Sequence, residues 1–232
     1  MKIINALKNV GFVIPAQAEI QFTQNAGFRG KPGMTTFVFL LLFALLSLPV
    51  AAQAEKNILI FGDSLSAGYG IDIAESWPYL LQQELDRTGF KIVNTSISGE
   101  TSLGGRQRLV RLLKQYHPAI VILELGANDG LRGYAITDTE ENLNAILLQT
   151  SQAGAKTLLI GMKLPPNYGA PYIAQFQGMF PRLAKKHRIR LLPYLLEGVK
   201  ADQFQADNLH PDAAAQPRIM NNVLQALKPL LR

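Results

Sequence analysis

Residues 119–125 read Ala-Ile-Val-Ile-Leu-Glu-Leu, an apolar run that leads directly into Gly126-Ala127-Asn128-Asp129. Shorter runs rich in β-branched and aliphatic residues recur at 58–61, 91–94, 156–160 and 189–192. Strands that are apolar on both sides are typical of a parallel sheet that helices cover on both faces. The sequence therefore predicts five buried strands in one such sheet.

The stretches between these runs carry apolar residues three or four positions apart, as amphipathic helices do. Within 103–116, for example, Leu109, Leu112 and Leu113 share one face, whereas Arg108 and Arg111 lie elsewhere. Helices are predicted at 76–88, 103–116, 139–153, 172–187 and 217–229. Right-handed crossovers between the strands then give a three-layer α/β/α domain around a mostly parallel, five-stranded sheet.

Composition excludes several classes of protein. The 232 residues include no cysteine, which rules out disulfides, a thiol nucleophile and a lipidated-cysteine anchor. The three histidines, His117, His187 and His210, are far apart in the sequence, so we expect no metal and no cofactor. The net charge of +6 divides evenly between residues 1–54 and the remainder, without the clustered basic face that nucleic acid requires.

The N-terminal segment is typical of an export signal. Residues 37–52 are an apolar run without charge, shorter than the roughly 20 residues that span a bilayer. Ala52-Gln53-Ala54 supplies the small-x-small pattern of a cleavage site. We expect residues 1–54 to be an N-terminal extension and signal peptide, cleaved after Ala54, and 55–232 to be a single domain. An uncleaved membrane anchor is the alternative, and Met34 is an alternative start.

Sites in parallel α/β sheets form where loops leave the carboxyl ends of the strands. The loop after the first strand contains Gly62-Asp63-Ser64-Leu65, which alone is as consistent with an ordinary turn as with a nucleophile. Three further stretches accompany it in chain order: Ser98-Gly99-Glu100 after the second strand, Gly126-Ala127-Asn128-Asp129 after the third, and Asp207-Asn208-Leu209-His210 near the C-terminus.

Together these four stretches resemble the conserved blocks of the GDSL/SGNH hydrolases, whose fold is flavodoxin-like. Leu164-Pro165-Pro166-Asn167-Tyr168-Gly169 extends the similarity to the bacterial periplasmic thioesterase I, lysophospholipase and arylesterase branch. The resemblance covers essentially all of 57–230. One departure is Ala127, where that branch often has glycine.

The resemblance implies a role for each of these positions. Ser64 would be the nucleophile and His210 its general base, while Asp207 fixes the imidazole tautomer that faces Ser64. The oxyanion hole would consist of the backbone N–H groups of Ser64 and Gly99 and the side-chain amide of Asn128. Asp63 and Asp129 stay outside this triad, as residues that brace their own loops.

The substrate region is less specific. The loop after the fourth strand would contribute to acyl-chain binding through Leu164, Pro165, Asn167 and Tyr168, or it would be only a rigid connection. Five aromatic residues line an apolar pocket or belong to the core, which is the usual place for such residues: Tyr69, Trp77, Phe176, Phe180 and Phe204. His117 and His187 are expected at the surface.

We therefore expect a serine hydrolase of carboxylic esters and thioesters, lysophospholipid among them, that acts as a monomer on small molecules. It would bind no nucleic acid and keep no membrane span in its mature form. Export to the periplasm is expected, with the outer-membrane surface or secretion as alternatives. An O-acetyl esterase of cell-envelope carbohydrate and a surface binding protein that retains the fold are the competing hypotheses.

Overall fold

Five strands form one parallel sheet in the computed structural model, which describes residues 55–232. Their order across the sheet is β2-β1-β3-β4-β5, with β3 in the centre. The strands are β1 (Lys56–Gly62), β2 (Phe90–Asn94), β3 (Ile120–Glu124), β4 (Lys156–Ile160) and β5 (Arg190–Leu192). Every pairing is parallel, so the carboxyl ends of all five strands meet at one edge.

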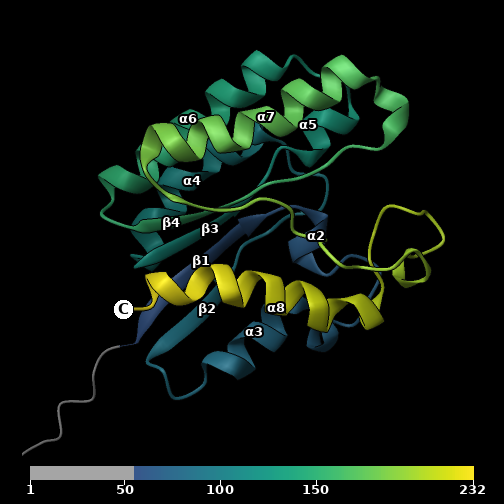
Figure 1. Ribbon diagram of the computed structural model, residues 1–232. Coiled ribbons are helices and arrows are strands. Elements are labelled where there is room, and N and C mark those ends of the chain that lie inside the picture. The colour runs from purple at the N-terminus through teal and green to yellow at the C-terminus, as the bar shows by residue number, and fades with distance from the viewer. Residues whose placement is uncertain (1–54) are drawn as a thin grey trace, which may run out of the picture. The chain divides into compact units, whose positions relative to one another are not determined.

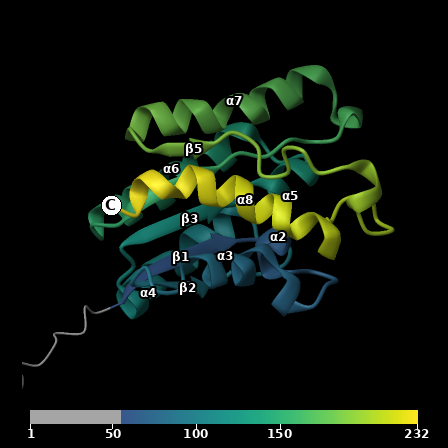
Figure 2. The same ribbon diagram turned by 60° about the horizontal axis from the view of Figure 1, so that its bottom comes forward.

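Helices cover both faces of this sheet. On one face lie α4 (Ser102–Tyr116), α6 (Ile136–Gln152) and α7 (Ala170–His187), and on the other α3 (Trp77–Leu85) and α8 (Gln216–Leu227) (Figure 1). Figure 2, turned to bring the second face forward, shows α8 running along the strands. The predicted α/β/α class and the parallel five-stranded sheet are confirmed.

Short helices lie in the connections between these elements. Two of them, α2 (Ser64–Ala67) and α5 (Ala127–Leu131), follow β1 and β3 directly and carry candidate site residues. The others are single 3₁₀ turns: η1 (Ile73–Glu75), η2 (Pro166–Tyr168), η3 (Ala201–Gln203), η4 (Ala213–Ala215) and η5 (Lys228–Leu230). The periodicity of the sequence predicted none of these, because a single turn is too short to show a repeat.

The predicted helix bounds differ from the structure mainly at two ends. The helix predicted at 76–88 ends at Leu85, because Arg87 and Gly89 adopt left-handed backbone angles (φ 70° and 77°) that turn the chain into β2. The helix predicted at 139–153 begins three residues earlier, at Ile136. Of the helices formed by residues 55–232, none combines the length and apolar character needed to cross a membrane.

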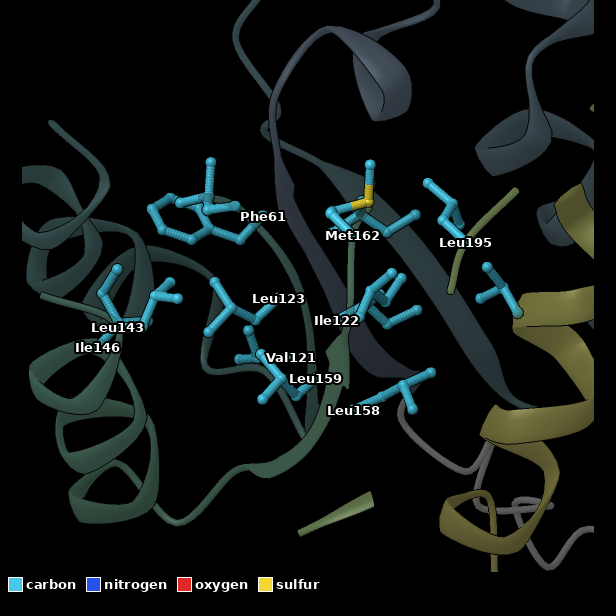
Figure 3. Packing of buried hydrophobic residues seen from close by; sticks show 14 of the residues in the cluster. Phe61, Val121, Ile122, Leu123, Leu143, Ile146, Leu158, Leu159, Met162 and Leu195 are labelled. Atoms are coloured by element: carbon cyan, nitrogen blue, oxygen red, sulfur yellow. The ribbon is translucent and has the colours of Figure 1, made fainter. Parts of the chain in front are cut away.

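The core lies on both sides of β3, all five residues of which are buried. Side chains alternate between the two faces of a strand. Val121 and Leu123 accordingly face Leu143 and Ile146 of α6, while Ile122 faces the layer that contains α8 (Figure 3). This apolar packing on two faces holds the sheet edge in a fixed geometry.

Three of the five aromatic residues considered for the pocket belong to this core. Trp77, Phe176 and Phe180 are buried. The Trp77 indole N–H donates to the carbonyl of Leu65 in α2 (3.1 Å), and its backbone N–H donates to the side chain of Gln216 (3.0 Å). Trp77 therefore ties the first turn after β1 to the helices beneath it.

Removal of core side chains is expected to destabilise this domain in proportion to their burial. Leu159→Ala in β4 should lower the free energy of unfolding by about 2–5 kcal/mol, because the truncation leaves a cavity between packed layers. Leu148→Ala, at a position of α6 that is 46% exposed, is the matched control and should change it by less than about 0.5 kcal/mol. Urea denaturation of both variants measures the difference, and equal effects would contradict the assigned layers.

Candidate active site

Ser64 is the first residue of α2 and follows β1 after a single intervening residue. That residue, Asp63, caps the helix: its Oδ1 accepts from the backbone N–H of Leu65 (3.1 Å). Gly68 ends the helix with a left-handed backbone (φ 76°). The chain thus makes one tight turn at the carboxyl edge of the sheet and presents the Ser64 hydroxyl there.

The structure brings Ser64, His210 and Asp207 together. His210 Nε2 lies 2.8 Å from Ser64 Oγ, and His210 Nδ1 lies 2.6 Å from Asp207 Oδ2. Asp207 Oδ1 accepts from the backbone N–H groups of Leu209 (2.9 Å) and His210 (3.0 Å). These hydrogen bonds, those of His210 first, lower the pKa of Asp207 from 3.8 to about 2. The carboxylate can therefore hold Nδ1–H and leave Nε2 free to accept the serine proton.

Tyr69 restrains the imidazole from the other side. Its ring centroid lies 4.5 Å from that of His210, and the planes of the two rings make an angle of 40°. Gln205 Nε2 donates to the carbonyls of Tyr69 (2.8 Å) and Pro211 (3.1 Å), which joins the histidine loop to the loop after α2. This contact between Tyr69 and the base was not predicted from the sequence, since it depends on how two distant loops meet.

The predicted oxyanion donors border the same cleft. Within residues 55–232, no group accepts a hydrogen bond from the backbone N–H of Ser64 or of Gly99, so both can serve a ligand. Asn128 is held differently: its Nδ2 donates to Asp63 Oδ2 and to the carbonyl of Glu100, each at 3.0 Å. Its amide is therefore fixed at the cleft wall, and it would have to share one of these protons with an oxyanion.

The cleft has a volume of about 360 Å³ and runs from Ser64 and His210 across the loops after β3 and β4. Leu164 and Pro165 line it, whereas Asn167 and Tyr168 are not among its lining residues. Tyr168 instead donates its hydroxyl to the carbonyl of Leu131 (2.8 Å), which braces the loop after α5. Of the five aromatic residues considered, Tyr69 and Phe204 reach the cleft.

With this geometry in place, the sequence profile of the GDSL-like Lipase/Acylhydrolase family matches residues 60–217. The chain belongs to this family. Among its relatives are Esterase TesA of Pseudomonas aeruginosa (46% identity over 198 residues, 83% of this chain and 98% of that protein) and Thioesterase 1/protease 1/lysophospholipase L1 of Escherichia coli strain K12 (43% over 197 residues, 84% and 92%).

Solved structures agree with this membership. The esterase EstA from a Pseudoalteromonas species, in a structure inhibited by monoethylphosphonate, matches with a TM-score of 0.73 and 40% identity. The match covers 76% of this chain and 99% of that one. The prediction of a GDSL-type hydrolase is confirmed.

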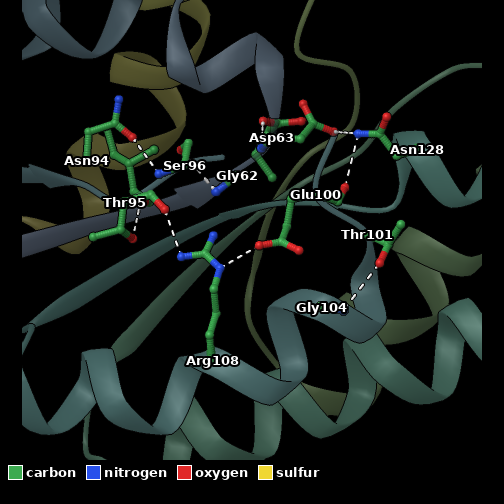
Figure 4. Close-up of polar contacts among 12 residues, drawn as sticks. Gly62, Asp63, Asn94, Thr95, Ser96, Glu100, Thr101, Gly104, Arg108 and Asn128 are labelled. Carbon is green, nitrogen blue, oxygen red and sulfur yellow. Dashed lines mark hydrogen bonds and ion pairs between the residues drawn. The ribbon is translucent and has the colours of Figure 1, made fainter. Parts of the chain in front are cut away.

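In this GDSL hydrolase, Arg108 anchors the loop that carries Gly99 (Figure 4). Arg108 Nε forms an ion pair with Glu100 Oε2 (2.5 Å), Nη1 donates to the carbonyl of Thr95 (2.8 Å), and the guanidinium lies 4.2 Å from the centre of the Phe61 ring. One side chain thereby fixes both ends of the loop. Helical spacing placed Arg108 away from the apolar face of its predicted helix. It did not predict these contacts, because periodicity does not reveal which partners a side chain reaches.

Two carboxyl groups lie buried behind Ser64. Asp63 and Glu124 are both inaccessible to solvent, and the backbone N–H of Asp63 donates to Glu124 Oε2 (3.1 Å). Burial raises the pKa of Asp63 from 3.8 to about 6 and raises the pKa of Glu124 well above its ordinary value. Glu124 was seen in the sequence only as part of a strand, although one carboxylate in an otherwise apolar strand is the signal that could have identified it.

Asp129 supports the Asn128 loop, in keeping with its predicted bracing role. Its Oδ2 accepts from the backbone N–H of Ser102 (2.8 Å) and its Oδ1 from the Ser102 hydroxyl (2.6 Å), so α5 is joined to the start of α4. Asp63 was also assigned a bracing role. Besides capping α2, it contacts Glu124 through its backbone N–H and Asn128 through its carboxylate.

The remaining histidines lie away from this site. His117 is exposed after α4, whereas His187, expected at the surface, is half-buried and lies 2.9 Å from Asn144 Oδ1 through its Nε2. The helix end packs inward there, which periodicity alone did not indicate. Within residues 55–232 no group of three or more histidine or carboxylate side chains is arranged to hold a metal ion.

Asp207→Asn tests the assigned electrostatics. Because the folded-state pKa of Asp207 lies below its ordinary 3.8, its carboxylate stabilises the fold above about pH 4 and loses that effect as the pH falls toward about 2. The difference in unfolding free energy between wild type and variant should therefore shrink as the pH falls from about 4 toward about 2. Denaturant titrations across this range measure it, and a difference that grows in acid would contradict the assignment.

Proposed function

We propose that this chain is an exported serine hydrolase that cleaves the carboxylic esters and thioesters of acyl chains through an acyl-enzyme on Ser64. The type is that of the lysophospholipases, acyl-thioesterases and arylesterases. One observation carries the proposal: Ser64 Oγ, His210 Nε2, His210 Nδ1 and Asp207 Oδ2 form a continuous chain with separations of 2.8 and 2.6 Å. Such a chain turns a weak nucleophile into a strong one.

Acylation begins when His210 Nε2 removes the Ser64 proton and Ser64 Oγ attacks the acyl carbonyl carbon. The imidazolium that forms is stabilised by Asp207, which remains ionised. As the tetrahedral intermediate collapses, the carbon–oxygen or carbon–sulfur bond to the leaving group breaks. His210 returns the proton to the departing alkoxide or thiolate, and the acyl group stays on Ser64.

The oxyanion of the intermediate needs donors that are aimed at it in advance. The N–H groups of Ser64 and Gly99 are available for this, and Gly99 keeps a left-handed backbone (φ 77°) that only glycine adopts readily. The Asn128 amide is the third proposed donor. Deacylation repeats the sequence, with water in place of Ser64: His210 takes its proton, and the free acid leaves.

The cleft wall supports an acyl chain as the part of the substrate that is recognised. Its lining is largely apolar, through residues that include Leu131, Met162, Leu164, Pro165, Leu196 and Phe204. Such a wall suits hydrocarbon, whereas an acetylated sugar offers hydroxyl groups that need polar partners. This lining favours acyl esters over the alternative of cell-envelope O-acetyl groups. The proposed triad comes from one chain, and we propose that the hydrolase acts as a monomer.

Hydrolysis of p-nitrophenyl esters and acyl thioesters of several chain lengths tests this function. Wild type should hydrolyse them, with the highest kcat/KM for chains long enough to fill the cleft. Ser64→Ala and His210→Ala should each lower kcat by at least about 10³-fold, since the residues of a triad act as a unit. A fluorophosphonate should label Ser64 in wild type and fail to label the His210→Ala variant.

Acetylated glycan serves as the competing substrate in the same assay. Preference for it over every acyl ester would replace the proposal with the carbohydrate esterase alternative. Full retention of the cellular activity by Ser64→Ala would instead support a binding protein that retains the fold. Tyr79→Phe, at an exposed position of α3, is the control and should leave turnover unchanged.

Export is part of the proposal and rests on residues 37–54, which lie outside the described residues. The apolar run followed by Ala52-Gln53-Ala54 supports removal of residues 1–54 and release of the domain that starts at Glu55. The periplasm is the proposed destination.

The mass of the protein recovered from a periplasmic extract checks this cleavage. It should correspond to residues 55–232, with Glu55 at the N-terminus. Ala54→Arg should leave an uncleaved precursor, because the peptidase requires a small residue at that position. A full-length mass for the wild-type protein in the membrane fraction would support the uncleaved anchor instead.

A further inference from the structure

Glu124, the last residue of β3, occupies a position that the strand register creates. The parallel pairing of β1 with β3 sets Gly62 opposite Glu124. A side chain at position 62 would place its Cβ 2.5 Å from Glu124 Oε2, so only glycine leaves room for the carboxyl group there. Glu124 Oε2 accepts from the Ser66 hydroxyl (2.7 Å) and from the backbone N–H of Asp63 (3.1 Å).

Asp63 connects this buried carboxyl to the cleft. Its Oδ1 accepts from the N–H of Leu65 (3.1 Å), and its Oδ2 accepts from the Asn128 amide (3.0 Å), the bond drawn in Figure 4. The backbone N–H of Asp63 donates to Glu124 Oε2 (3.1 Å), and both side chains are buried, so the two carboxyl groups are neighbours out of water. A chain of contacts therefore runs from Glu124 through Asp63 to Asn128, with Ser64 next to Asp63 in the sequence.

Two neighbouring carboxyl groups out of water cannot both carry a charge, so the pair holds one proton. The donors around the pair indicate where that proton lies. Both oxygens of Asp63 receive an N–H group, which favours its ionised form. Glu124 Oε1, by contrast, is buried and faces no donor within the described residues, so a charge there would be uncompensated. Burial raises the pKa of both carboxyl groups, that of Glu124 well above its ordinary value.

We propose that Glu124 is a positioning residue for hydrolysis: as a neutral carboxylic acid it donates its proton to Asp63, whose carboxylate then orients the Asn128 amide beside the nucleophile. The inference rests on the proposed function, since it concerns the same reaction. Asp63 is thereby more than a cap of α2. It carries the one negative charge of the pair and aims an oxyanion donor with it.

The experiment uses two substitutions at position 124 in the exported, full domain. Glu124→Gln keeps a neutral side chain whose carbonyl can accept from Ser66 and whose amide can donate to Asp63. Glu124→Met keeps the size but has no such groups. Glutamine should retain kcat within about 3-fold, whereas methionine should lower kcat by about 10–100-fold and leave KM within about 3-fold, because the orientation of an oxyanion donor matters in the transition state.

Ser66→Ala is the matched control. It removes one hydrogen bond to Glu124 and leaves the contacts of Asp63 with Glu124 and Asn128 in place. A merely structural role of Glu124 in holding α2 predicts that Ser66→Ala impairs turnover as much as Glu124→Met does, and that result would overturn the proposal. A loss of kcat in Glu124→Gln as large as in Glu124→Met would overturn it as well, because a neutral amide would then fail to replace the acid.

A double-mutant cycle tests the route through Asn128. If Glu124 acts by way of Asp63 and Asn128, Glu124→Met should lower kcat by less than about 2-fold in the Asn128→Ala background. Fully additive losses would contradict this route. Ser64→Ala in the same assay separates the two proposals: if it stays active the hydrolase function fails, and if it is inactive while Glu124→Met matches wild type only the role of Glu124 fails.

Discussion

The register of β1 on β3 is the constraint on which the active site depends. Parallel pairing brings the ends of both strands to one edge and sets Gly62 against Glu124, where the missing side chain leaves room for a carboxyl group. The residues that follow each strand, Asp63 on one and Asn128 on the other, then meet at 3.0 Å. A shift by one residue would turn every side chain of a strand to its opposite face and separate this pair.

This arrangement carries a cost in stability. Removing two carboxyl groups from water is unfavourable even when hydrogen bonds replace the solvent, and Glu124 Oε1 has no donor facing it within residues 55–232. The apolar layers on both sides of β3 offset the cost, since the strand is buried along its whole length. Functional sites are where proteins accept such local conflicts between burial and polarity.

The sequence predicted the fold because apolar runs and helical periodicity are local properties, and five such runs identified five strands. It predicted the residues that meet around Ser64 because four stretches in chain order resemble the conserved blocks of the GDSL/SGNH hydrolases, and three of these stretches follow strand ends, which meet at one edge of a parallel sheet. It did not predict the contact of Glu124 with Asp63, the inward reach of Arg108 or the bond from Tyr168 to Leu131. Those depend on side-chain directions and on register between distant segments, which no periodicity encodes.

Asp207 and His210 lie three positions apart on the loop that precedes η4 and α8, and Gln205 within that loop contacts Tyr69. The base and the carboxylate that orients it are thus encoded by one short stretch of the gene. A recombination event between relatives with its crossover upstream of this stretch transfers Asp207 and His210 together, so their spacing in the sequence is kept. Divergence of the loops that shape the cleft can then proceed without separating the proton acceptor from its anchor.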